Sequence, residues 1–302
     1  MNALYNPRAT ELALLLLLAT LWGASYTLIK LGVATIPPLT LIAARTLIAG
    51  LLLLLVLRWR GLTLPKDAAN WRRFTVQACL NSVIPFTLIA WAEQSLDAGL
   101  ATILSSTSPI FAFLLTFAVT RHEPVAGRKL FGVAAGLAGI CLIVGVEALR
   151  GLGIEPVSQL AMVTATVAYA GAAIFGRGFK GLDPMIPAAG SLVCGAAILI
   201  PLSLFDRPWT VAPSQSSMLA LLGLAIFSTA LAFVIYFRLV QTLGSVGTTA
   251  QAYLRVPIGV LLGVVFLGEA LTPTAWIGLG CVVLGVAAMT IPSRVTPSLR
   301  GA

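Results

Sequence analysis

Charged side chains are scarce in this chain. Asp, Glu, Lys and Arg together account for 10% of its 302 residues, whereas hydrophobic residues account for 59%. About a quarter of the residues of an average globular protein are charged, and they cover the surface that faces water. The composition therefore excludes a water-soluble protein and predicts one whose solvent is lipid.

Groups that serve catalysis, metal binding or nucleotide binding are also scarce. The one histidine, His122, lies in a predicted loop, so it cannot pair with the buried Ser105 or Ser106 at membrane depth. No GxxxxGK[ST] motif occurs, and the four cysteines lie in apolar runs without CxxC spacing. We predict no enzyme activity, no cofactor and no metal ion. An intramembrane enzyme acting on a lipid or a peptide is the alternative.

Long apolar runs are what the chain has in abundance. A bilayer core about 30 Å thick needs about 20 apolar residues per helix. Ten such runs occur, at residues 10–31, 38–57, 74–92, 98–119, 130–147, 157–176, 185–205, 217–237, 246–267 and 274–291. The first run is longer than the apolar part of a signal peptide, so we expect it to be retained. The predicted fold is an all-α integral membrane protein with ten transmembrane helices.

Basic residues predict the orientation of these helices, because Lys and Arg resist translocation and collect on the cytoplasmic side. The predicted loops on one side hold most of them: Arg8, Arg58, Arg60, Lys66, Arg72, Arg73, Arg121, Arg128, Lys129, Arg177, Lys180, Arg238, Arg294 and Arg300. The other side holds Lys30, Arg150 and Arg207. The net charge of +9 thus indicates membrane orientation rather than nucleic-acid binding. We expect both termini to be cytoplasmic.

The two halves of the chain share a pattern of glycine, proline and glutamate. An offset of 148 positions aligns Gly23 with Gly171, Gly99 with Gly247 and Pro109 with Pro257. An offset of 146 positions aligns Glu123 with Glu269, Gly132 with Gly278 and Gly139 with Gly285. We predict two five-helix repeats, at residues 1–148 and 149–302. Because five is odd, the second repeat enters the membrane from the opposite side, as in many alternating-access transporters.

Polar side chains inside the apolar runs mark a candidate substrate cavity. Arg255 lies about nine positions into the ninth run and shares one helix face with Thr248 and Gln251. Such an arginine faces a cavity or a partner, so it either attracts a substrate carboxylate or pairs within the protein and locks the bundle. The fourth run carries a matching stripe of hydroxyl side chains: Thr102, Ser105 and Ser106.

Aromatic and amide side chains extend the candidate cavity. Trp22 and Tyr169 lie beside the aligned Gly23 and Gly171, and Tyr26 follows one helical turn after Trp22. They are expected to form flat walls for an apolar or aromatic substrate, although aromatic residues in membrane helices also serve packing. Asn81 either faces the same cavity or forms an interhelical hydrogen bond.

We expect other residues of the apolar runs to have structural roles. Arg45 lies about seven residues from the outer end of its run, so we expect it to snorkel or to meet Glu93 or Asp97. Pro109 and Pro257 each remove a backbone hydrogen bond and are the candidate hinges. Close helix packing is expected at six glycines: Gly132, Gly136, Gly139, Gly278, Gly280 and Gly285.

Three segments resemble the drug/metabolite transporter superfamily in its ten-helix EamA-type branch: WGASYTLIKLG from Trp22, PPLTLIAARTLIAG around Arg45, and RHEPVAGRKLFGVAAGLAGI. The resemblance covers nearly all of residues 10–291. It implies a multi-pass secondary transporter of the bacterial inner membrane that exports a small-molecule substrate. Among bacterial members the chain resembles the aromatic and neutral amino-acid exporter, so the resemblance favours amino acids. Drugs and nucleotide-type metabolites remain alternative cargoes.

Overall fold

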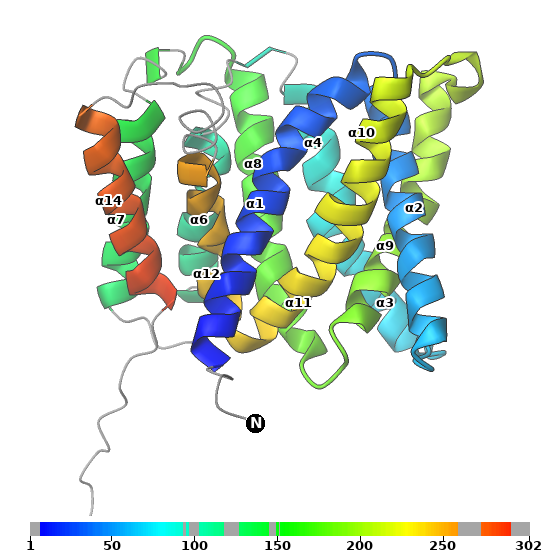
Figure 1. Cartoon of the computed structure of the whole chain (residues 1–302), viewed down its shortest axis with the longest axis horizontal. Helices are drawn as coiled ribbons and strands as arrows, with labels where there is room; N and C mark the ends of the chain where they lie inside the picture. The colour runs from blue at the N-terminus through cyan, green and yellow to red at the C-terminus, as the bar shows by residue number, and fades with distance from the viewer. Residues whose placement is uncertain are drawn as a thin grey trace, which may run out of the picture.

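The protein is a bundle of helices (Figure 1). The structure is a computed structural model and describes residues 7–92, 95–96, 103–117, 127–144, 149–150, 152–258 and 273–290. Within these residues every regular element is helical. The prediction of an all-α membrane protein is confirmed.

The first half of the chain supplies the helices of the first five predicted spans. In chain order they are α1 (Pro7–Val33), α2 (Pro38–Trp59), α3 (Ala68–Ala78), the π-helix η1 (Cys79–Val83), α4 (Ile84–Ala92), α6 (Ser108–Leu115) and α7 (Gly127–Val144).

The second half repeats this order. Its elements are α8 (Pro156–Gly176), the 3-10 helix η4 (Arg177–Phe179), α9 (Met185–Ser203), α10 (Gln215–Ala225), the π-helix η7 (Ile226–Leu231), α11 (Ala232–Thr242), α12 (Gly244–Thr249), a helical stretch at 251–258, and α14 (Pro273–Thr290).

Each of the ten predicted runs contains helical residues. Five continuous segments are long and apolar enough to cross a bilayer alone: Pro38–Trp59, Ala68–Ala92, Pro156–Phe179, Met185–Asp206 and Gln215–Thr242. Shorter apolar helices at Ala9–Ser25, Ile103–Leu115 and Trp276–Thr290 coincide with three further runs. The runs at 98–119, 130–147 and 246–267 extend partly outside the described residues.

Local sequence signals explain where several helices begin. Pro38 and Pro156 occupy the first turn of α2 and α8, where the missing backbone N–H costs no hydrogen bond. The Asp67 side chain caps α3 by accepting from the Asn70 backbone N–H at 2.9 Å. Hydrogen bonds from the side chain and backbone of Asn70 also hold the pKa of Asp67 below its usual value.

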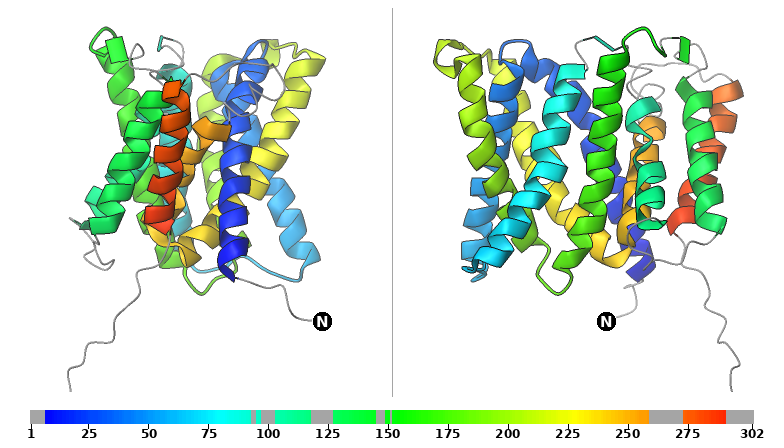
Figure 2. Two further views of the ribbon diagram at one scale, coloured as in Figure 1. Left: turned by 60° about the vertical axis from the view of Figure 1, so that its left-hand side comes forward. Right: turned by 180° about the vertical axis from the view of Figure 1, so that it is seen from behind.

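The two halves run in opposite directions through the bundle. We call the end formed by the turns at 60–67 and 180–184 the lower end, and the end formed by 34–37 and 204–214 the upper end (Figure 1). The helix α1 runs from the lower to the upper end, whereas its counterpart α8 runs from the upper to the lower end (Figures 1 and 2). The counterparts α2 and α9 are likewise opposed. The halves are therefore inverted repeats, as predicted.

The last helices of the two halves, α7 and α14, pack closely through glycine. A Cβ atom added to Gly139 would lie 2.6 Å from the Gly278 carbonyl oxygen, and one added to Gly132 would lie 2.7 Å from the Gly285 carbonyl oxygen. The 146-residue offset maps each of these contacts onto the other, so the pair is symmetric. The packing prediction is wrong for Gly280, whose added Cβ would meet no atom within 4 Å.

The π-helices η1 and η7 occupy equivalent places in the halves. Cys79 begins η1 and Ile226 begins η7, close to the repeat offset of 148 positions. A π turn takes up one extra residue, changes the direction of the side chains that follow, and often occurs at functional sites. Both π-helices lie inside a longer helical segment, between α3 and α4 and between α10 and α11.

Candidate functional site

A pocket lies between helices of both halves. It is lined by α1, α2, η1, α4, α8 and the stretch at 251–258, through Trp22, Ser25, Ile29, Val33, Pro38, Leu41, Ile42, Arg45, Asn81, Phe86, Ile89, Ala90, Tyr169 and Arg255. Val33 ends α1 and Pro38 begins α2, so the pocket reaches the upper end. Four predicted cavity residues, Trp22, Asn81, Tyr169 and Arg255, belong to this lining.

Trp22 and Arg255 form the deep part of the pocket. The Arg255 guanidinium lies 5.1 Å from the Trp22 ring centroid, in a cation–π arrangement. The Trp22 indole N–H donates to the Ser228 carbonyl oxygen at 3.1 Å, which fixes the ring. A Cβ added to Gly23 would lie 3.8 Å from the Arg255 carbonyl oxygen, so Gly23 brings the two backbones close together. Arg255 Nε donates to Gln251 Oε1 at 2.8 Å.

Arg45 also faces the pocket, which the sequence analysis did not predict. The whole residue is only 3% exposed, so it does not snorkel to the outer interface and that expectation is wrong. Its Nε donates to Thr229 Oγ1 at 3.1 Å, and its guanidinium lies 4.4 Å from the centroid of the Phe86 ring. The proposed partners Glu93 and Asp97 lie outside the described residues.

The π-helix η7 holds Trp22 and Arg45 through two consecutive residues. Ser228 accepts from Trp22 with its carbonyl oxygen, and its hydroxyl donates to the Leu21 carbonyl oxygen at 2.8 Å. Thr229 donates its hydroxyl proton to the Leu224 carbonyl oxygen at 2.8 Å, which leaves its lone pairs for Arg45. The element that departs from α-helical geometry thus fixes two pocket side chains.

Asn81, on the matching π-helix η1, is 1% exposed. Asn81 belongs to the pocket lining, and its side-chain Nδ2 is buried without a hydrogen-bond partner among the described residues. A buried amide with unused donors costs free energy unless a ligand or water completes its hydrogen bonds. Asn81 therefore makes no interhelical hydrogen bond through Nδ2 within the described residues, and its contact with substrate stays a prediction.

Several predicted cavity residues lie elsewhere. Thr248 is fully buried and donates to the Gly244 carbonyl oxygen of its own helix at 2.8 Å. Gln251 is not among the lining residues, but it accepts a hydrogen bond from Arg255, which is. Ser105 and Ser106 are not part of the lining. Thr102 and the side chain of Tyr26 lie outside the described residues.

The candidate hinges lie beside interruptions of their helices. The fourth span turns at Ser106–Thr107, and Pro109 follows in the first turn of α6, where proline is well tolerated. Pro109 therefore follows a break instead of kinking a continuous helix. The ninth span turns at Ala250, and Pro257 lies in the stretch at 251–258. The hinge role of both prolines stays a prediction.

Below the pocket the bundle is closed by aromatic side chains. The Phe74 and Phe179 rings stack with centroids 5.6 Å apart, and Phe237 meets Phe179 edge-on at 5.9 Å. All three side chains are fully buried. They come from α3, η4 and α11, and Tyr236 connects them to Trp22 with ring centroids 5.7 Å apart. Packed rings therefore separate the pocket from the lower end.

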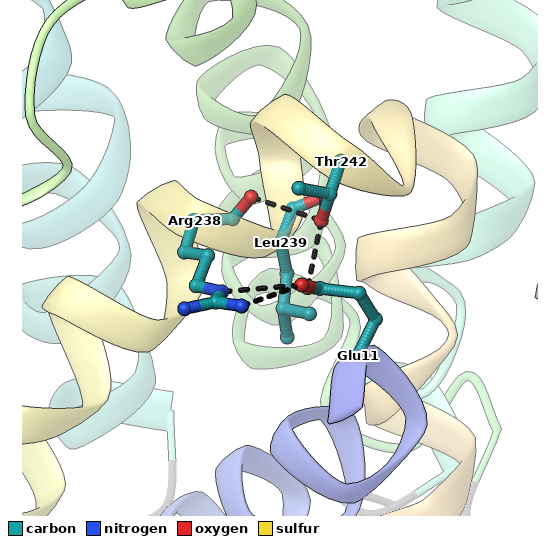
Figure 3. A network of polar contacts seen from close by, with 4 residues as sticks. All are labelled: Glu11, Arg238, Leu239 and Thr242. Carbon is teal, nitrogen blue, oxygen red and sulfur yellow. Dashed lines mark hydrogen bonds and ion pairs between the residues drawn. The ribbon is translucent and has the colours of Figure 1, made fainter. Parts of the chain in front are cut away.

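An ion pair joins the two halves at the lower end (Figure 3). Glu11, near the start of α1, accepts from Arg238 Nε at 3.2 Å and Nη2 at 2.9 Å, both at its Oε1 atom. Its Oε2 atom accepts from the Thr242 hydroxyl at 2.8 Å. Glu11 is only 7% exposed. This contact is not predictable from the sequence, because nothing in the local pattern shows that α1 and α11 meet.

Comparisons with known proteins agree with this architecture. A model of the EamA-like transporter family matches residues 9–145 and again residues 157–291. The "Uncharacterized inner membrane transporter YedA" of Escherichia coli K12 is 29% identical over 281 residues, 92% of this chain and 90% of that protein. "Protein PecM" of Dickeya dadantii is 25% identical over 260 residues, 85% of this chain and 84% of that protein.

A solved crystal structure with the same fold gives a TM-score of 0.76, 21% identity, and coverage of 93% of this chain and 98% of the other. The family model matches once in each half, so it spans the pocket and both π-helices. Together with the apolar helices, these matches indicate a multi-pass inner-membrane transporter of small molecules. The chain belongs to the EamA-like transporter family.

Proposed function

We propose that this protein is a gradient-driven secondary transporter that exports small organic solutes by alternating access, with aromatic and neutral amino acids as its main cargo. One observation carries the proposal. A pocket between the inverted halves reaches the upper end, while packed aromatic rings and an ion pair close the lower end. That arrangement fits one of the two states that alternating access requires.

The lining suits an amino acid with an apolar side chain. Trp22, Tyr169 and Phe86 offer aromatic groups, and Ile29 and Ile89 add apolar surface. Arg45 and Arg255 provide positive charge for a carboxylate, and Asn81 provides an amide. Small-molecule sites commonly combine mostly apolar walls with a few placed polar groups.

Export is compatible with the expected orientation, and the resemblance to exporters supports it. With both termini in the cytoplasm, the lower end faces the cytoplasm and the pocket reaches the outside. Cargo would then enter when the lower end opens and leave through the upper end. No residue of the described lining is acidic, so the described part of the pocket holds no carboxyl group that could carry a proton.

The test is counterflow in proteoliposomes that contain the purified full-length chain. Labelled phenylalanine and leucine should accumulate against an internal pool of the same amino acid and be recovered unchanged. Trp22→Ala should weaken apparent affinity about three- to thirtyfold, because the ring that faces Arg255 is lost. Trp59→Ala is the control, since Trp59 ends α2 and is 87% exposed.

Two results would contradict the proposal. A chemically altered product without accumulation would favour the intramembrane enzyme. Absence of counterflow for amino acids, nucleosides and cationic drugs alike would exclude transport of these classes. If only a nucleoside or a drug showed counterflow, the protein would still be a transporter, but amino acids would not be its cargo.

A further inference from the structure

Arg45 is the buried cation of the pocket whose hydrogen-bonding capacity is largely unused. Its Nε donates to Thr229, while both terminal nitrogens have no hydrogen-bond or ion-pair partner among the described residues. The residue is 3% exposed and begins about two turns below the start of α2, roughly 10 Å from the upper end. A buried charge without an anionic partner costs several kcal/mol, so such residues usually mark binding sites.

The contacts of Arg45 hold it in one orientation. Thr229 is itself fixed by its bond to Leu224, and the Phe86 ring covers one face of the guanidinium at 4.4 Å. The edge that carries the two terminal nitrogens is thereby left for a ligand. A planar guanidinium edge binds a carboxylate through two parallel hydrogen bonds.

Asn81 adds a second donor in the same lining. Its Nδ2 is buried and has no partner among the described residues. Arg255, in contrast, has partners within the protein: its Nε donates to Gln251 and its guanidinium lies over Trp22. The unused donors of the pocket therefore belong to Arg45 and Asn81.

We propose that Arg45 and Asn81 form an anion subsite that binds the carboxylate of the cargo, which makes this a transporter of carboxylates with an apolar body. The inference rests on the proposed transport function. Arg255 then positions Trp22 at the deep wall, where the ring contacts the apolar part of the cargo. Ile42, Phe86 and Ile89 supply the remaining apolar contact.

The test compares a carboxylate with its uncharged amide. Binding of 3-phenylpropionate and of 3-phenylpropanamide to the purified full-length chain in nanodiscs is measured by calorimetry. The wild-type protein should bind the carboxylate about ten- to a hundredfold more tightly than the amide. Arg45→Met should lower the affinity for the carboxylate much more than the affinity for the amide, so that the preference is lost. Asn81→Ala should reduce the preference to a smaller extent.

Arg58→Met is the matched control, because Arg58 lies on the same helix but is exposed near its lower end. It should keep the full preference. Replacing a buried arginine by methionine is expected to leave the melting temperature unchanged or higher. If Arg45→Met does not fold, Thr229→Val provides the second variant: it removes the acceptor of Arg45 Nε and should lower the preference while Arg45 keeps its charge.

Three results would overturn the subsite. They are equal wild-type affinity for both probes, retention of the preference in Arg45→Met, and absence of saturable binding of either probe. In the third case, counterflow of another solute in proteoliposomes would show that transport stands although the carboxylate subsite does not. A structural role for Arg45 would change the affinity for both probes equally.

Discussion

At the scale of single residues, Gln251 and Arg255 act as one unit. Gln251 Oε1 accepts from Arg255 Nε at 2.8 Å, and only Arg255 reaches the pocket lining. Gln251 is therefore a positioning residue that holds the guanidinium over Trp22. Residues joined in this way show non-additive effects when both are replaced.

We predict that Gln251→Ala lowers counterflow of phenylalanine less than Arg255→Ala does, and that the double variant is no worse than Arg255→Ala. The apparent affinity and the maximal rate of all three variants are measured in proteoliposomes. Thr248→Ala serves as the control, because the Thr248 hydroxyl bonds within its own helix and does not reach the pocket. Additive losses in the double variant would show that Gln251 acts independently of Arg255.

The same scale shows what sequence reasoning can assign. Trp22, Asn81, Tyr169 and Arg255 were found because polar and aromatic residues are conspicuous inside apolar runs. Arg45 was equally conspicuous, but its position in the run suggested snorkelling. Its true environment depends on Thr229, 184 residues away in the chain, and a pattern within one run cannot show such a contact.

At the scale of elements, helix lengths were predictable and their internal irregularities were not. Hydropathy alone places the apolar runs, because a bilayer sets how many residues a helix needs. The π turns η1 and η7 carry no such signal, since Cys79–Val83 and Ile226–Leu231 read as ordinary apolar helix. The turn before Pro109 was equally hidden, although the proline itself was noted.

We predict that Gly139→Ala and Gly280→Ala have opposite effects on stability. Alanine at 139 would place its Cβ 2.6 Å from the Gly278 carbonyl oxygen, so α7 and α14 must separate, at a cost of about 1–3 kcal/mol. Alanine at 280 meets no neighbour and should stabilise α14 by up to about 1 kcal/mol. Melting temperatures in detergent would measure both.

The inverted repeat provides a control for that experiment. Gly285→Ala places its Cβ 2.7 Å from the Gly132 carbonyl oxygen, which is the symmetric contact, so its cost should match that of Gly139→Ala. If Gly139→Ala were as stable as Gly280→Ala, the close packing of α7 and α14 would be incorrect.

At the scale of the whole molecule, the opposed halves require that turns alternate between the two membrane faces. We predict that cysteines at Lys66 and Lys180 react with an impermeant thiol reagent from one face, and cysteines at Arg150 and Trp209 from the other. Each is introduced singly into a chain without the four native cysteines, and all four positions are exposed. Labelling of Lys66→Cys and Arg150→Cys from the same face would contradict the inverted arrangement.

If the protein works by alternating access as proposed, the lower end must open during the cycle. Glu11 belongs to the first half, and Arg238 and Thr242 belong to the second, so their hydrogen bonds exist only while α1 and α11 meet (Figure 3). Opening the lower end in alternating access must separate these elements. The contact therefore lowers the free energy of the state with a closed lower end relative to the state with an open lower end.

We predict that Glu11→Gln raises the population in which the lower end is open. Because Arg238 is 39% exposed, the ion pair is worth about 1 kcal/mol, and its loss should shift the ratio of states about fivefold. The reporter is a cysteine at Leu239, which is fully buried beside the pair, in a chain without native cysteines. Its reaction with an impermeant thiol reagent added at the lower face should accelerate by a similar factor.

Two further variants decide whether the ion pair itself is responsible. Glu155→Gln removes an exposed carboxylate at the start of α8, near the upper end, and should leave the reaction rate of the Leu239→Cys reporter unchanged. The exchange of charges in Glu11→Arg with Arg238→Glu restores the attraction and should slow the reaction again. If Glu11→Gln left the rate unchanged, the closure would depend on the packed rings of Phe74, Phe179 and Phe237 alone. If the exchanged pair reacted as fast as Glu11→Gln, the bond from Thr242 to Glu11, and not the opposite charges, would hold α1 against α11.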